Sequence, residues 1–184
     1  MSVTTLVTAE QLIRMPKEAR YELVAGELKP MSPSPGSIHC AIECFLAGTL
    51  GLHVRKHRLG IVMTGDPGFL LERDPDTVLA PDIAFIRAER LAAQPLTQRY
   101  WPGVPDLAIE IRSPSTSRRE FRDRALALLA AGFPLVWMVD VASRTVTVYR
   151  SATDSEILSE GAELEAPDIL PGFRCPIAEL FTDL

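Results

Sequence analysis

Apolar positions recur along the chain at two spacings, one typical of helices and one typical of strands. Apolar stripes at helical spacing predict two amphipathic helices. Their buried positions would be Ile38, Ile42, Phe45 and Leu46 in the first helix, and Phe121, Ala125, Leu128 and Leu129 in the second. Ser37 would cap the first of them. A capping box at Thr8 predicts a short helix that ends near Pro16, and Ala88–Ala93 predicts another.

Runs rich in branched residues predict the strands. They are Ile61–Met63, Phe69–Leu71, Val78–Ile86, Leu107–Ile111, Leu135–Val139 and Thr145–Tyr149, with a hairpin turning at Ala25–Gly26. Helices before, between and after these strands favour an α/β fold (α+β), in which helices flank a central mixed β-sheet. The chain has 184 residues, which fits one domain over 1–184. It would comprise an N-terminal helix and hairpin (8–31), a core (37–150) and a wrapping tail (151–184).

Composition narrows the class of protein. Hydrophobic residues make up 47% and charged residues 23%, which excludes a disordered or fibrous chain. No apolar run reaches about 18 residues, and the N-terminus has no signal-peptide pattern, so we expect no membrane and a cytoplasmic protein. The three cysteines, Cys40, Cys44 and Cys175, do not form a disulfide framework. The net charge of −5 disfavours indiscriminate binding to polyanions, although a local basic strip stays open.

Two Pro-Asp dipeptides lead into predicted strands and place acidic residues in apolar surroundings. Asp82 precedes one strand, and Asp106 precedes the next, whose middle holds Glu110. Because side chains alternate along a strand, Glu110 and Arg112 would share one face. A buried carboxylate is unfavourable unless something pairs with it, so its partner would be Arg112, a neighbouring strand or a bound cation.

Five segments agree in order and spacing with one known family. They are Tyr21–Leu28, Met31–Pro33 with His39, Pro81–Phe85, Pro105–Glu110 with Ser113–Ser115, and Val136–Asp140. The chain resembles, from about Thr8 to Phe181, the Uma-type family of putative restriction endonucleases, a branch of the PD-(D/E)xK nuclease superfamily. The resemblance implies a restriction endonuclease-like fold and a metal-dependent endonuclease that hydrolyses DNA phosphodiester bonds.

The resemblance also implies a set of site residues. Asp82 and Glu110 would hold a hard divalent cation, Mg²⁺ with Mn²⁺ as the alternative, through carboxylate oxygens. Glu22, rather than Glu27, would be an auxiliary acid of the site. The cation would polarise the scissile phosphate and lower the pKa of the attacking water. A homodimer is expected only because nucleases that cut both strands often act as symmetric pairs.

The chain departs from the superfamily at its lysine. Arg112 stands two residues after Glu110, where that lysine is usual, and Arg124 stands where the Uma-type branch carries it on the next helix. Arginine stays protonated, so it can stabilise charge on a phosphate but cannot accept a proton from water. Both arginines are therefore candidates for a catalytic role, and Arg112 could equally be a structural partner of Glu110. The departure also favours an alternative function, a catalytically impaired nuclease-fold protein that binds nucleic acid or another protein.

Other clusters allow weaker hypotheses. Arg118, Arg119 and Arg122 would contact the nucleic-acid backbone beside the site. The basic run over 52–58 is typical of a helix end, or could touch phosphates. A zinc site is conceivable within one further cluster, although packing roles are favoured because no second ligand pair has suitable spacing. That cluster is His39, Cys40, Glu43 and Cys44. A small-molecule hydrolase is disfavoured, because the chain contains no Gly-x-Ser-x-Gly, Walker-type or His-Glu-x-x-His motif.

Overall fold

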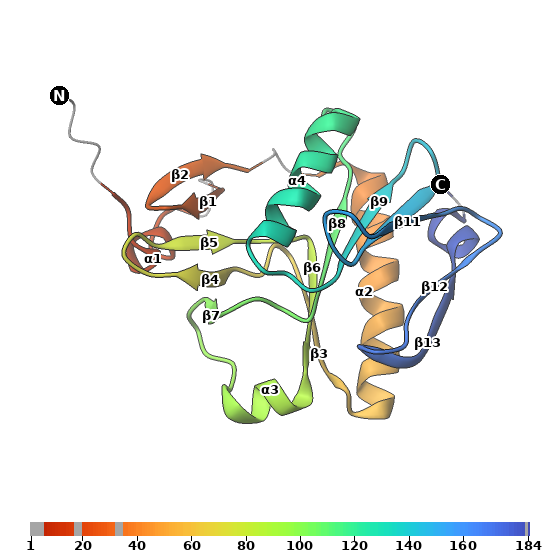
Figure 1. The fold of residues 1–184 in the computed structure, drawn as a ribbon, viewed down its shortest axis with the longest axis horizontal. Coiled ribbons are helices and arrows are strands. Elements are labelled where there is room, and N and C mark those ends of the chain that lie inside the picture. The colour runs from red at the N-terminus through yellow and green to blue at the C-terminus, as the bar shows by residue number, and fades with distance from the viewer. Residues whose placement is uncertain (1–5, 17–19, 32–34, 183) are drawn as a thin grey trace.

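A computed structural model of the protein describes residues 6–16, 20–31, 35–182 and 184 (Figure 1). Most of the segment Met31–Pro33 therefore lies outside the described residues. The helices are α1 (Ala9–Leu12), α2 (Ser37–His57), α3 (Ala88–Ala93), α4 (Arg118–Ala130) and the 3-10 helix η1 (Ile177–Phe181). The strands are β1 (Tyr21–Val24), β2 (Glu27–Pro30), β3 (Gly60–Thr64), β4 (Phe69–Glu72), β5 (Thr77–Leu79), β6 (Ile83–Arg87), β7 (Trp101–Pro102), β8 (Leu107–Ile111), β9 (Val136–Asp140), β10 (Thr145–Tyr149), β11 (Ser155–Leu158), β12 (Glu163–Ala166) and β13 (Leu170–Pro176).

The central element is a six-stranded mixed sheet in the order β11-β10-β9-β8-β6-β3. Its strands β8 and β9 run parallel, and the other neighbours run antiparallel. A second sheet, in the order β2-β1-β5-β4-β7, was not anticipated, since the strand pattern predicted a single mixed sheet. The second sheet packs against the first at the N-terminal side of the chain, and β12 and β13 form a separate hairpin (Figure 1).

The predicted strand Val78–Ile86 is wrong, because two strands occupy it. β5 belongs to the five-stranded sheet and β6 to the six-stranded one, with Ala80–Asp82 between them. Pro81 has no N–H and cannot donate to a strand ladder, so continuous pairing stops there and the chain crosses from one sheet to the other. The crossing places Asp82 where the two sheets meet.

Helices cover both faces of the central sheet, as predicted (Figure 1). One face packs on the stripe Ile42, Leu46, Leu50 and Val54 of α2, and the other on Ala125 and Leu128 of α4. Ile38 was expected to be one of the buried residues of α2. This is wrong, because its side chain is 46% exposed. The helix is also capped one residue earlier than expected, at Gly36 rather than Ser37.

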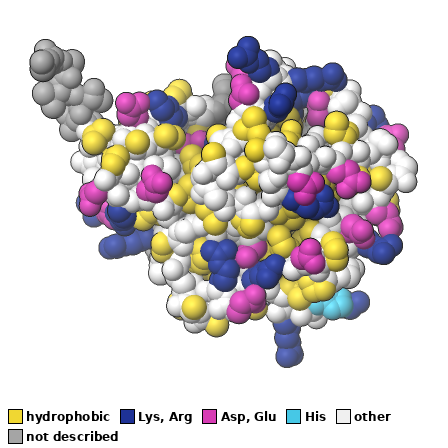
Figure 2. All heavy atoms as spheres, viewed as in Figure 1, with side chains coloured by type: hydrophobic (Ala, Val, Ile, Leu, Met, Phe, Trp, Pro, Cys, Tyr) yellow, Lys and Arg dark blue, Asp and Glu magenta, His cyan; other side chains and the backbone are white. Residues whose placement is uncertain are grey.

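The beginning of α4 matters for the site and is fixed by local chemistry. Ser117 accepts a hydrogen bond from the backbone N–H of Glu120, and the Glu120 carboxylate accepts one from the N–H of Ser117. This capping box satisfies N–H groups that a helix start leaves unpaired. Gly132, just past the helix, has a φ of +93°, which a residue with a Cβ rarely adopts. In the view of Figure 2, basic side chains gather where α4 begins.

The described part of the chain after residue 150 packs onto the core. β11 extends the central sheet, while β12, β13 and η1 pack beside α2. Among the described residues, α2 is also the one helix long and apolar enough, by length and composition, to cross a membrane. In this structure its buried stripe packs on the central sheet, which is how a core helix is placed. All three cysteines are free.

Candidate active site

The two predicted acids meet across neighbouring strands. β6 and β8 pair antiparallel with Ile83 opposite Ile109, so extending this register by one position puts Asp82 opposite Glu110. The backbone N–H of Ile111 donates a hydrogen bond of 2.6 Å to Oδ2 of Asp82, which holds the aspartate against β8. Directly opposite residues project to the same face of a sheet. Asp82 and Glu110 therefore face one space, on the side of the sheet that α4 covers.

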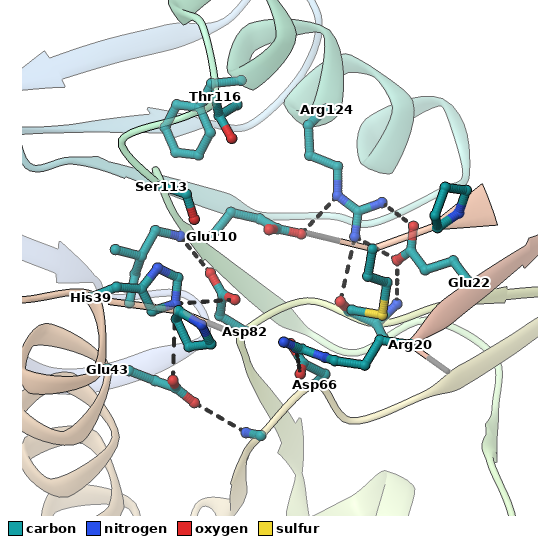
Figure 3. Close-up of a pocket in the computed structure, with 17 residues that line it drawn as sticks. Arg20, Glu22, His39, Glu43, Asp66, Asp82, Glu110, Ser113, Thr116 and Arg124 are labelled. Carbon is teal, nitrogen blue, oxygen red and sulfur yellow. Dashed lines mark hydrogen bonds and ion pairs between the residues drawn. The ribbon is translucent and has the colours of Figure 1, made fainter. Parts of the chain in front are cut away.

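That space is a cavity of about 450 Å³, here called the carboxylate cavity (Figure 3). Its charged lining consists of Glu22, Glu43, Asp66, Asp82, Glu110, Arg20 and Arg124, together with His39. Four of the five residues predicted for the catalytic site are thus brought together, from β1, the start of β6, β8 and α4. Carboxylates outnumber guanidinium groups by five to two, so the cavity is acidic.

Arg124 reaches from α4 and joins two of the acids. Its Nε donates to Oε1 of Glu110 at 2.8 Å, and its two terminal nitrogens donate to both oxygens of Glu22 at 2.6 and 2.7 Å. Oε1 of Glu22 also accepts the backbone N–H of Ala80 at 2.6 Å. Glu22 lies in the cavity, where sequence analysis placed it as an auxiliary acid. Both of its carboxylate oxygens accept hydrogen bonds from Arg124 and so hold that side chain in place. Glu27, the residue passed over for this role, is exposed and pairs with Lys29.

The pKa values of Glu110 and Arg124 are both raised, but for different reasons. Burial raises the pKa of Glu110 to about 8, helped by the nearby charges of Asp82 and Glu22, although Arg124 works in the opposite sense. Burial acts against the charge of Arg124, but Glu110 and Glu22 together raise the pKa of its guanidinium above the ordinary value. Arg124 is therefore a permanent cation, whereas Glu110 keeps its proton up to about pH 8.

The opposite wall of the cavity comes from α2 and the turn after β3. Nε2 of His39 lies 3.4 Å from Oδ1 of Asp82 and 4.0 Å from Oε2 of Glu43. Its bond to Asp82 raises the pKa of His39, although burial lowers it. Glu43 is itself fixed by the hydroxyl of Thr64 and the N–H of Gly65. His39 thus connects Asp82 to a positioned second carboxylate, while its buried Nδ1 has no hydrogen-bond partner among the described residues.

The expectation that Arg112 shares the site of Glu110 is wrong in geometry. Its guanidinium pairs with Asp140 at 2.8 Å and donates to the carbonyl oxygen of Thr116, so it ties β8 to β9 and to the loop before α4. β8 ends at Ile111, and the alternation of faces does not continue beyond a strand's last residue. Burial would raise the pKa of Asp140, but its bonds to Arg112 and its neighbours lower it. Arg112 therefore has a structural position.

The three arginines predicted to contact the nucleic-acid backbone lie in two different places. Arg118 and Arg122 line a second cavity of about 340 Å³ on the far side of Phe121, here called the arginine groove. Arg119 does not line it, because its side chain is 91% exposed and lies 3.8 Å from Asp123. The basic run over 52–58 forms the end of α2 and its C-cap at Arg58. This agrees with the interpretation of the run as a helix end.

The zinc hypothesis for the start of α2 finds no geometric support. Cys40 and Cys44 are exposed, and His39 points to Asp82 instead. Within the described ranges, no group of three or more His, Cys, Asp or Glu side chains could hold a metal ion. Asp66 and Arg20, which form an ion pair in the cavity wall, were missed by the sequence analysis. Asp66 lies in an irregular turn with a φ of +57°, so periodicity gave no signal for it.

The mixed sheet flanked by helices, with acids of two neighbouring strands facing a helical cation, defines a restriction endonuclease-like α/β protein. A family model described as "Uma2: Putative restriction endonuclease" matches residues 9–178, so the chain belongs to that family. Five solved chains match the structure. One of them, described as a putative nuclease belonging to DUF820 from Anabaena variabilis, is 23% identical with a TM-score of 0.77. That match covers 96% of this chain and 98% of the other, and at this identity it concerns the fold. No curated protein matches this chain.

Proposed function

We propose that the protein is a metal-dependent endonuclease that hydrolyses phosphodiester bonds of DNA. The observation that carries the proposal is the meeting of Asp82 and Glu110 across β6 and β8, opposite the fixed cation Arg124. Membership of the Uma2 family supports a nuclease-type function. Mg²⁺, with Mn²⁺ as an alternative, is the proposed cofactor, and a homodimer in the cytoplasm is the proposed state of the protein.

The residues present fit a magnesium ion. Mg²⁺ is commonly held by one or two carboxylates, waters and substrate phosphate oxygens rather than by a cage of protein ligands. Asp82 and Glu110 supply two carboxylates, and the backbone carbonyl of Ile111 remains a third candidate ligand. Waters and phosphate oxygens of the substrate would have to supply the other ligands. Binding of the cation would displace the proton that buried Glu110 otherwise holds, because a ligating carboxylate must be deprotonated.

In hydrolysis, the oxygen of a water forms a bond to phosphorus while the bond from phosphorus to a bridging oxygen breaks. The leaving oxygen then takes a proton. When bound, the cation would polarise the phosphate and lower the pKa of the attacking water. The chain's own contribution is positional and electrostatic. Glu22 and Glu110 fix Arg124, whose permanent charge can stabilise the negative charge that develops on the phosphate.

The test is cleavage of a plasmid by the purified protein with Mg²⁺ or Mn²⁺. Asp82→Asn and Glu110→Gln each keep the side-chain size and remove a carboxylate charge. We expect each change to lower the rate at least roughly a hundredfold, the scale seen when one group that stabilises transition-state charge is removed. Glu27→Gln is the matched control, because Glu27 is an exposed carboxylate outside the cavity. Cleavage that persists in the Asp82→Asn, Glu110→Gln double variant would contradict the proposal.

A second candidate function rests on the same arginine. Arg124 occupies the family's lysine position and is already bonded to both Glu22 and Glu110, which favours a nuclease fold retained for binding alone. Arg124→Lys separates the two functions. If the natural chain is an endonuclease that uses Arg124, the lysine variant should cleave more slowly, because lysine cannot reproduce the paired bonds to Glu22. If the lysine variant cleaves and the natural chain does not, the natural chain is an impaired relative that acts as a binding module.

A further inference from the structure

The arginine groove differs from an ordinary surface depression in how it is built. α4 forms one wall through Arg118, Phe121 and Arg122, and β9, β10 and β11 form the floor. α4 packs on β9, and no described helix covers β10 and β11 on this face of the central sheet. Ile157 on this floor is 70% exposed. The groove is therefore an uncovered stretch of sheet beside a helix, with polar side chains along its floor. These are Ser143, Thr145, Thr147 and Tyr149.

The groove carries unbalanced positive charge. Arg118 and Arg122 lie four residues apart on α4, and like charges at this spacing repel each other. Arg118 has a single carboxylate nearby, Asp140 at 3.6 Å, which is already held by Arg112 at 2.8 Å. Across the described part of the chain, no carboxylate forms an ion pair with Arg122. Such an arrangement is complementary to an anion supplied from outside, such as a phosphate.

The groove adjoins the carboxylate cavity at Phe121. Phe121 lines both spaces, and Thr116, from the loop before α4, lines the first beside it. Arg112 and Asp140 join the two regions through β8 and β9. A polymer whose phosphate lies among Asp82, Glu110 and Arg124 would therefore pass Phe121 and continue over Arg118 and Arg122.

The aromatic side chains decide which form of nucleic acid fits. Phe121 and Tyr149 both line the groove and are half-buried, since each also packs against the apolar cluster under α4. Aromatic side chains interleaved with basic ones are typical of surfaces that bind unpaired strands, because free bases stack on the rings. In a duplex the base faces are already stacked on one another, and a rigid double helix does not enter a space of about 340 Å³.

We propose that the arginine groove binds unpaired nucleotides of the strand whose phosphodiester lies in the carboxylate cavity. Phe121 and Tyr149 stack on the bases, and Arg118 and Arg122 hold the phosphates. The inference rests on the proposed function, because it takes the occupant of the groove to be the nuclease substrate. It adds that the substrate is single-stranded, frayed or branched next to the cleaved bond.

The test measures binding rather than cleavage. The full chain is titrated, in EDTA, into a short fluorescein-labelled single-stranded DNA and into a hairpin duplex of the same sequence, and anisotropy reports affinity. We expect the single strand to bind at least roughly tenfold more tightly than the hairpin. Arg122→Glu should lower that affinity roughly tenfold or more, because it reverses a charge facing the phosphates. Arg174→Glu is the matched control, on the β13 side of the molecule, and should change it less than about threefold.

A second variant keeps the test sharp if an arginine change perturbs folding. Thr147→Glu adds a negative charge to the groove floor at a half-exposed strand position, and should also reduce single-strand affinity. Equal affinity for strand and hairpin, or equal losses in Arg122→Glu and Arg174→Glu, would overturn the assignment. Groove-dependent binding without cleavage in Mg²⁺ or Mn²⁺ would support the groove and contradict hydrolysis. Cleavage that no groove variant alters would contradict the groove alone.

Discussion

The carboxylate cavity and the arginine groove lie on either side of Phe121 and take arginines from one helix, yet these arginines are in opposite states. Arg124 donates to Glu110 and Glu22 in the first cavity. Arg122, two residues earlier, forms no ion pair with any described carboxylate. The first is held by the protein's own acids, while the second is available to a ligand. Position along one helix thus separates an arginine that builds the site from one that can bind substrate.

The strongest test of this difference removes each arginine in turn. Arg124→Ala leaves Glu22 and Glu110 buried without their partner, which should lower the free energy of unfolding by about 3 kcal/mol. Arg122→Ala removes an exposed charge and should stay within about 0.5 kcal/mol of the natural chain. Urea denaturation followed by circular dichroism measures both. Similar losses in the two variants would mean that the two arginines do not differ as described.

Some of this comparison could be predicted from the sequence, and some could not. The apolar periodicity correctly predicted α4, and strand alternation placed Glu110 away from the apolar face of β8. The resemblance supplied Arg124 for the helix position that faces Glu110. Local patterns carried this information because each depends on residues a few positions apart.

The failures come from long-range geometry. Apolar residues on both sides of Pro81 gave no sign that the chain changes sheets there. Alternation placed Arg112 beside Glu110 only because it was extended past the end of β8, where Asp140 of the neighbouring strand turns the side chain away. Asp66 joins the cavity from a turn, where no period applies. Glu43 was named only within the zinc cluster, although its position one helical turn after His39 also places it in the carboxylate cavity.

The second prediction concerns how the carboxylate cavity positions its acids. His39→Gln removes the ring that lies between Asp82 and Glu43. Partners of metal-ligating side chains typically contribute roughly 10- to 100-fold in metal affinity, so Mg²⁺ or Mn²⁺ should bind more weakly by that factor in calorimetric titrations. Cys40→Ser, an exposed neighbour outside the cavity, should leave the affinity unchanged. An unchanged affinity in His39→Gln would show that Asp82 does not need this contact.

The third prediction uses the raised pKa of Glu110. The folded protein holds this proton up to about pH 8, whereas an unfolded carboxyl loses it near 4.5. Between these values the folded state binds more protons, so the unfolding free energy of the metal-free protein should fall as pH rises, by at most about 1.4 kcal/mol per pH unit. A cation needs the carboxylate, so metal affinity should rise up to about tenfold per pH unit over the same range.

Calorimetric titrations and urea denaturation at several pH values check both slopes. Glu110→Gln has no carboxyl at this position, so both slopes should become flatter in that variant. If the natural chain and the variant share one pH profile, Glu110 does not carry the titration.

The prediction with the smallest expected effect concerns the salt dependence of DNA binding. It distinguishes a groove that binds several phosphates of a nucleic-acid strand from one that binds a single anion. Each phosphate contact to a single strand contributes roughly 0.7 to the slope of log affinity against log salt concentration. Arg118→Ala and Arg122→Ala should each lower that slope by about this amount, and the double variant by about twice as much, if both contact phosphates. Tyr149→Leu should weaken binding while leaving the slope unchanged, because stacking releases no counterions. Arg119 lies outside the groove, so Arg119→Ala should leave the salt slope unchanged. If Arg119→Ala lowers the slope as much as Arg122→Ala does, the strand follows the exposed side of α4 instead of the groove.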